Sequence, residues 1–309
     1  MGAVRKPPLV FAASLALALG LVLPSSCAVL RAASYSQQVF MREEDPQLAA
    51  DALPAFMKVS EMLLAADPEN QDKIVSTASL YVLYASAFIE APAELLPAEQ
   101  YRAHEKATRR ATALYHRAFR LLSPALERRS PGFLAAVGGP KEAAAAARFG
   151  RADVPLLYWS SAAILAAYAL NPLDFQMAAD LGAVPTMLAR AAALDPGWDR
   201  GAIYELYFPY YASMPDYLGG SRAKAEAAYA KALAYSKGDS ASLFVSRATS
   251  ICIPDDDYAG FKAALERALA VDPAADPDSR LANAIAQDRA RRLLAEAGTY
   301  FNLSKGEQQ

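Results

Sequence analysis

The chain has 309 residues, of which 54% are hydrophobic, and carries 31 Lys and Arg against 33 Asp and Glu, a formal net charge of −2. This length suffices for one large domain or two small ones. The balanced charge, without long single-sign runs, gives no support for nucleic acid as a partner. If the early Cys27 is modified, Cys252 has no partner for an intramolecular disulfide.

Residues 1–26 have the layout of a secretory signal peptide, with basic residues before an apolar run over 9–23. This run is too short to span a bilayer comfortably. Cys27 directly follows small residues, which is typical of the bacterial lipoprotein signal. Pro24 departs from that signal, so ordinary cleavage near Ser26 is the alternative. We expect lipidation at Cys27 and membrane contact through this anchor only, since no later segment looks long and apolar enough to span a membrane.

From about Val29 to Phe301 the sequence predicts helices, because no alternation of period two and no hairpin turn occurs. The fold is therefore expected to be all-α, with residues 27–301 as a single domain and 302–309 as a frayed tail. Asp-Pro and similar stops divide the first expected helices, which run over about 45–66, 71–90, 97–123, 156–169 and 174–181. Residues 123–150 are the least regular portion.

One helical packing pattern appears three times between residues 183 and 273. The copies read VPTMLARAAALDP, RAKAEAAYAKALAYSK and FKAALERALAVDP. Each places a large residue three positions before an alanine: Leu188 and Ala191, Tyr229 and Ala232, Leu265 and Ala268. The small residue lets a second helix approach closely, and a spacing of about 40 residues slightly exceeds the tetratricopeptide period. The sequence therefore predicts a degenerate helix-pair solenoid.

Candidate catalytic and metal-binding groups are few. His104 and His116 lie on one expected helix but about 120° apart around it, so they cannot readily share a metal or a proton. The run 255–257 of three aspartates lacks the glycine and glutamate of a calcium loop and is better explained by helix capping. The Gly-Gly-Ser at 219–221 could bind an anion, but a tight turn with Ser221 as N-cap is the favoured interpretation. We predict no catalytic residue, no metal site and no cofactor.

Aromatic residues gather in one part of the chain. Tyr158 and Trp159 share a helix, and Tyr204, Tyr207 and Tyr211 follow one another at i, i+3 and i+7 on one face of another. A helical core could use such rings, and that interpretation stays open. Buried tyrosine hydroxyls need partners, however, and tyrosine faces suit a pocket for a partly apolar ligand. We predict that these five side chains line an opening.

The last expected helix, 278–301, is amphipathic, with Leu281 and Ile285 among the apolar residues of one side. An amphipathic helix at this place is expected to cap the open end of a solenoid. Asn283 and Gln287 are one turn apart in it. They could form a polar edge of the predicted opening, but we favour hydrogen bonding to neighbouring backbone.

Four stretches resemble the T-component of bacterial tripartite ATP-independent periplasmic (TRAP) transport systems: ADVPLLYWSSAA, MLARAAALDPGWDRGAIY, GGSRAKAEAAYAKAL and RLANAIAQDRARRLL. The last is the most specific, and the resemblance is good over residues 150–301 and holds in outline over 27–149. It implies a periplasmic lipoprotein of degenerate tetratricopeptide helix pairs that assembles as a homotrimer with an opening through each subunit. It also implies that the protein acts together with the solute-binding subunit of the transporter and that it binds apolar ligands.

The residues and the resemblance together predict a non-enzymatic accessory component of a periplasmic uptake system. Such a protein would dock the solute-binding subunit and pass a partly apolar ligand through the aromatic-lined opening. The alternative is an envelope adaptor lipoprotein that binds a protein or peptide in a concave helical groove and transports no solute. An enzyme of envelope metabolism is the third hypothesis. The expected location is the periplasm, with a lipid anchor in a bacterial membrane.

Overall fold

The computed structural model describes residues 39–303, so the predicted signal peptide and the lipidation at Cys27 lie outside the described residues. Its helices are α2 (Pro46–Ala65), α3 (Gln71–Ala85), α4 (Ala91–Ala93), α5 (Tyr101–Arg129), α6 (Phe133–Ala136), α7 (Glu142–Ala146), α8 (Val154–Leu170), α9 (Phe175–Leu181), α10 (Ala183–Leu194), α11 (Ala202–Ser213), α12 (Arg222–Ser236), α13 (Ala241–Arg247), α14 (Tyr258–Ala270), α15 (Arg280–Ala295) and α16 (Ala297–Tyr300). Within 39–303 there is no strand, which confirms the all-α prediction.

Helix starts follow the local sequence closely. Asp45 precedes α2, and its carboxylate accepts hydrogen bonds from two free backbone N–H groups of the first turn. Ser221 caps α12 and Asp257 caps α14 in the same way. The aspartate run and the Gly-Gly-Ser turn thus serve as helix starts, as the sequence indicated.

Two helix ends differ from the prediction. The helix expected to stop before Pro124 continues through it to Arg129, as α5. Proline removes one backbone hydrogen bond from a helix, but Leu122, Ala125 and Leu126 on either side are all buried. Tertiary packing therefore overrides the local stop. Conversely, the expected helix 278–301 ends at Ala295, and α16 follows as a separate turn.

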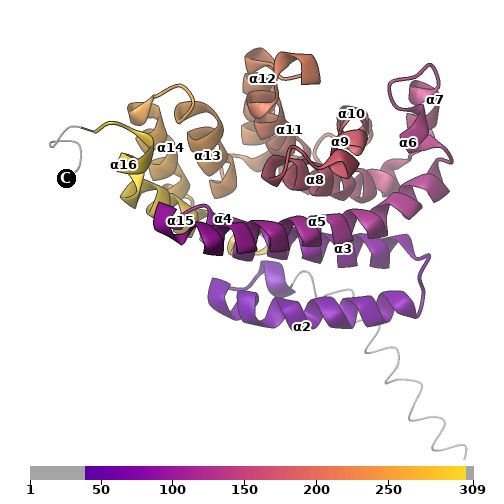
Figure 1. Ribbon diagram of the computed structural model, residues 1–309, viewed down its shortest axis with the longest axis horizontal. Helices are drawn as coiled ribbons and strands as arrows, with labels where there is room; N and C mark the ends of the chain where they lie inside the picture. Colours follow the sequence, from indigo (N-terminus) through magenta and orange to yellow (C-terminus); the bar gives the residue numbers. More distant parts are fainter. Residues whose placement is uncertain (1–38, 304–309) are drawn as a thin grey trace, which may run out of the picture.

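Consecutive helices pack against one another along most of the chain, as α2 with α3, α3 with α5, α5 with α8, α11 with α12 and α13 with α14 (Figure 1). The small residues of the three sequence copies lie in α10, α12 and α14, where α10 contacts α8, α12 contacts α11, and α14 contacts α13 and α15. Ala191, Ala232 and Ala268 are completely inaccessible to solvent. Close approach of neighbouring helices at alanine positions is what stacked helix pairs need.

The two ends of the described chain meet. Figure 1 shows α15 beside α4, and α15 also contacts α2. Ion pairs join the same regions: Arg42 with Asp278 at 2.7 Å, Arg280 with Glu44, and Arg289 with Glu94. The last long helix therefore lies against the first helices, and the chain curves back on itself.

Two helical segments, Gln71–Ala93 and Arg151–Leu170, are long and apolar enough to cross a membrane, by length and composition alone. This corrects the expectation that no later segment meets those criteria. Half of the first segment and 61% of the second are buried against other helices. Core helices of a folded domain meet the same criteria, and Leu80 and Leu157 illustrate this because both are buried in the main core.

Candidate functional site

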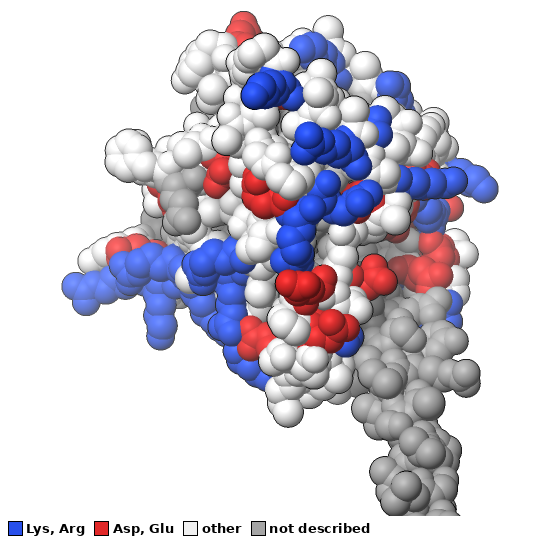
Figure 2. Space-filling view, turned by 90° about the vertical axis from the view of Figure 1, so that its right-hand side faces the viewer, with Lys and Arg blue, Asp and Glu red and all other residues white. Residues whose placement is uncertain are grey.

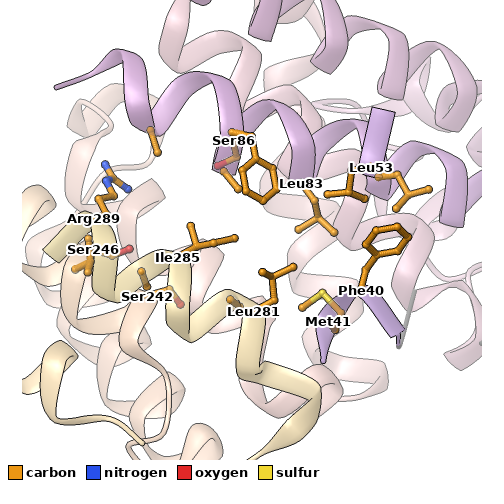
Figure 3. A pocket seen from close by; sticks show the side chains of 17 residues that line it. Phe40, Met41, Leu53, Leu83, Ser86, Ser242, Ser246, Leu281, Ile285 and Arg289 are labelled. Atoms are coloured by element: carbon orange, nitrogen blue, oxygen red, sulfur yellow. The ribbon is translucent and has the colours of Figure 1, made fainter. Parts of the chain in front are cut away.

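An apolar pocket lies where the two ends of the chain meet. Its cavity is about 260 Å³, and its walls come from the segment before α2, from α2, from α3 and the turn that follows it, and from α13 and α15. The lining includes Phe40, Leu53, Leu83, Leu281 and Ile285 (Figure 3). Concave sites lined mainly by apolar side chains with a few polar groups are typical of small-molecule binding.

A second pocket of about 720 Å³ adjoins the first, and its lining is more polar. The two pockets share Ala87, Phe88, Ala91, Ile285 and Arg289, so they meet along one wall. The second pocket adds charged residues of both signs from α2, the residues just before it, and α15, including Glu44, Asp51, Asp288 and Arg292. Together the pockets form one space with an apolar end and a charged end.

A π turn over Ser86–Glu90 helps to shape this wall. It interrupts the α-helical path between α3 and α4, and Ser86, Ala87 and Phe88 in it line the apolar pocket. Such widened turns are uncommon and are found often at functional sites. A second π turn, Ala248–Cys252, follows α13 directly.

Arg289 stands at the junction of the two pockets. Its Nη2 donates to Glu94 Oε2 at 2.5 Å, while its Nε is buried and has no hydrogen-bond partner. Glu90 lies close by and accepts a hydrogen bond from the hydroxyl of Tyr115. Burial raises the pKa of Glu90 to about 7, although the bond from Tyr115 and the charge of Arg289 oppose this.

Charged side chains elsewhere are mixed in sign. On the face shown in Figure 2, Lys and Arg lie among Asp and Glu. Many of them are paired, for example Arg129 with the buried Asp153 at 2.8 Å and Arg200 with Asp239 at 3.2 Å. Among residues 39–303 no group of three or more His, Cys, Asp and Glu side chains could hold a metal ion.

The five aromatic residues singled out in the sequence pack against rings and backbone. Tyr158 lies 5.0 Å from Trp159 between ring centroids, and Tyr207 stacks on Tyr211 at the same distance. Tyr204 stacks on Tyr235 at 5.6 Å. Tyr204 and Tyr207 are buried, and burial raises the pKa of Tyr158 and of Tyr207. None of the five lines the two adjoining pockets. An opening lined by these rings stays a prediction.

Asn283 and Gln287 are buried in α15. The Asn283 side chain donates to Asp239 O at 3.0 Å and accepts from Ala241 N at 2.9 Å. Gln287 donates to three backbone oxygens at the end of α14, the nearest being Val271 O at 2.7 Å, and it also borders the polar pocket. Both amides therefore fasten α15 to the preceding helices through backbone groups.

Sequence reasoning missed Arg289 and the pocket beside it. One signal was present, because Leu281, Ile285 and Arg289 recur at every fourth position and share a face of α15. An arginine in an otherwise apolar stripe is unusual, since a partly buried charge favours a nearby partner of opposite sign. Its partner Glu94 lies 195 positions earlier in the chain, where no local pattern connects it to Arg289.

Comparison with known proteins agrees with the resemblance seen in the sequence. The family described as TRAP transporter T-component matches residues 42–301. An uncharacterized protein of Treponema pallidum (strain Nichols) is 35% identical over 267 residues, which cover 85% of this chain and 83% of that protein. The family match includes every helix described above.

Proposed function

This chain belongs to the T-component family of TRAP transporters and is an accessory component of such a system, and we propose that it carries a partly apolar ligand in the pocket between its first and last helices. The observation that supports this is the apolar cavity of about 260 Å³ joined to a polar one of about 720 Å³. A ligand could enter from the charged pocket and place its apolar part against Leu83, Leu281 and Ile285.

We further propose that the protein docks the solute-binding subunit of its transport system from a lipid-anchored position in the periplasm, as a homotrimer. The family match supports association with a TRAP system. The signal-peptide pattern and Cys27 support the location. Neither role requires a catalytic step.

Binding of a neutral apolar dye such as Nile red tests the ligand role. Wild-type protein should bind it, and Ile285→Trp, which fills the pocket wall, should abolish the fluorescence change. Leu173→Trp serves as the matched control, because Leu173 is 80% exposed and lines neither pocket. Equal binding by both variants would place the dye elsewhere and count against this pocket.

Docking is tested separately by mixing the mature protein with the solute-binding subunit of its own transport system. Sedimentation velocity would report both the complex and the oligomeric state. A complex supports the docking role. If that subunit does not bind, the docking role is refuted, and a pull-down from the cell envelope that captures other proteins would favour the adaptor function.

A further inference from the structure

The joined pockets have opposite chemical character at their two ends, and a charged group stands between them. In Figure 3, Phe40, Met41 and Leu53 lie at one end of the apolar pocket, and Arg289 lies at the other beyond Ile285. Arg289 is the only Lys or Arg in the lining of the apolar pocket. A neutral apolar ligand would leave this guanidinium without a ligand contact.

We propose that the pocket binds a single-chain amphipathic carboxylic acid, whose carboxylate displaces Glu94 from Arg289 while its hydrocarbon chain fills the apolar end. This inference rests on the proposed ligand-carrying function and names the chemical class of the ligand. It follows from the position of Arg289, from the state of its hydrogen bonds and from the exposure of its present partner.

The guanidinium of Arg289 has unused hydrogen-bonding capacity. Arginine offers five N–H donors in a planar fork that matches a carboxylate in two-point contact. In the structure Nη2 binds Glu94, whereas Nε is buried without a partner. Because a buried N–H without an acceptor is unfavourable, a small shift of the side chain that gives Nε an acceptor would be favoured. An incoming carboxylate could supply that acceptor.

Glu94 is suited to be displaced. It follows α4 directly, and its side chain is 38% exposed, compared with 30% for Arg289. An ion pair that water reaches contributes little net stability, and Glu94 can turn into solvent once released. The Glu94 carboxylate thus occupies the place on the guanidinium that a ligand carboxylate would take. Release of Glu94 would also break a link between α15 and the turn after α4, at the junction of the two pockets.

Three serine side chains add polar groups to the lining of the apolar pocket. Ser86, Ser242 and Ser246 all line it (Figure 3). The Ser242 hydroxyl donates to Glu205 at 2.9 Å, so it is already engaged behind the wall. The Ser86 side chain is hydrogen-bonded to Tyr115, so it is engaged as well. Ser246 lies on the side of Arg289, where a second carboxylate oxygen could accept from its hydroxyl. The remaining lining is apolar, which suits a hydrocarbon chain and not a second charge.

Calorimetric titration with decanoate and with 1-decanol, below the concentration at which either aggregates, tests the inference. Wild-type protein should bind decanoate at least about tenfold more tightly than decanol, the size expected for a charge-assisted hydrogen bond. Arg289→Gln should remove that preference and leave decanol binding unchanged. Glu94→Gln should tighten decanoate binding several-fold, because the guanidinium is then free, and should also leave decanol unchanged.

The two variants separate binding from structure because both break the same ion pair. A purely structural pair would make Arg289→Gln and Glu94→Gln change decanoate affinity in the same direction, and that result would overturn the inference. Arg109→Gln is the matched control, since Arg109 pairs with Glu105 on the exposed face of α5 and lines neither pocket. Equal binding of decanoate and decanol by wild-type protein would refute carboxylate recognition and keep the ligand role. Binding of neither would refute the ligand role itself.

Discussion

Glu90 makes the stability of this protein depend on pH in a direction that can be derived from its surroundings. Burial raises the pKa of its carboxyl from 4.5 to about 7. The folded protein therefore binds this proton more tightly than the unfolded chain. The contribution to stability is fully present below about pH 4.5, is lost as the pH rises toward 7, and is absent above that.

A pKa difference of this size corresponds to roughly 3 kcal/mol between pH 4 and pH 8. Because Glu90 keeps partial contact with solvent, we expect about 2 kcal/mol to be measured. Glu90→Gln replaces the neutral acid with a neutral amide of similar shape. Its free energy of unfolding should match that of the wild type at pH 4 and exceed it by about 2 kcal/mol at pH 8.

Urea denaturation of both proteins at several pH values between 4 and 8 provides the measurement. Burial also raises the pKa of Asp199 and of Glu205. These groups act in both proteins, so the difference between the two curves isolates Glu90. Parallel curves would refute the reasoning.

Tyr115→Phe provides a control of opposite sign, because Tyr115 is completely buried and its hydroxyl bond lowers the pKa of Glu90. That variant should extend the loss of stability to higher pH.

Three further changes have expected outcomes. Leu122→Ala should lower the free energy of unfolding by about 2–5 kcal/mol in urea, since this side chain is completely buried in α5 beside Pro124; a loss below 1 kcal/mol would mean that packing does not sustain the helix there. Asn283→Ala should cost about 1–3 kcal/mol in thermal or urea unfolding because it leaves the backbone N–H of Ala241 buried without an acceptor, and an unchanged melting curve would contradict that role. Cys27→Ser should move the protein from the membrane fraction to the soluble periplasmic fraction, whereas retention in the membrane would show that another contact anchors it.

The aromatic residues show where a sequence pattern stops being informative. Tyr204, Tyr207 and Tyr211 share a helix face, as their spacing indicates. Spacing says nothing of what that face meets, and in the structure Tyr204 meets Tyr235, while Tyr207 and Tyr211 stack on each other. Asn283 and Gln287 were easier to interpret, because amides one turn apart on an amphipathic helix commonly find backbone partners.

The sequence by itself determined the helices, because helical hydrogen bonds, caps such as Asp45 and Ser221, and a stripe of small residues act within a few positions of one another. The family resemblance also came from such local stretches. Only the tertiary structure decided that α5 continues through Pro124, that α15 lies against the first helices, and that Arg289 meets Glu94. Those outcomes depend on the packing angles between many successive helices, which together bring the end of the chain back to its beginning. No local sequence pattern encodes the combined effect of these angles, and the pocket exists only where the two ends of the chain meet.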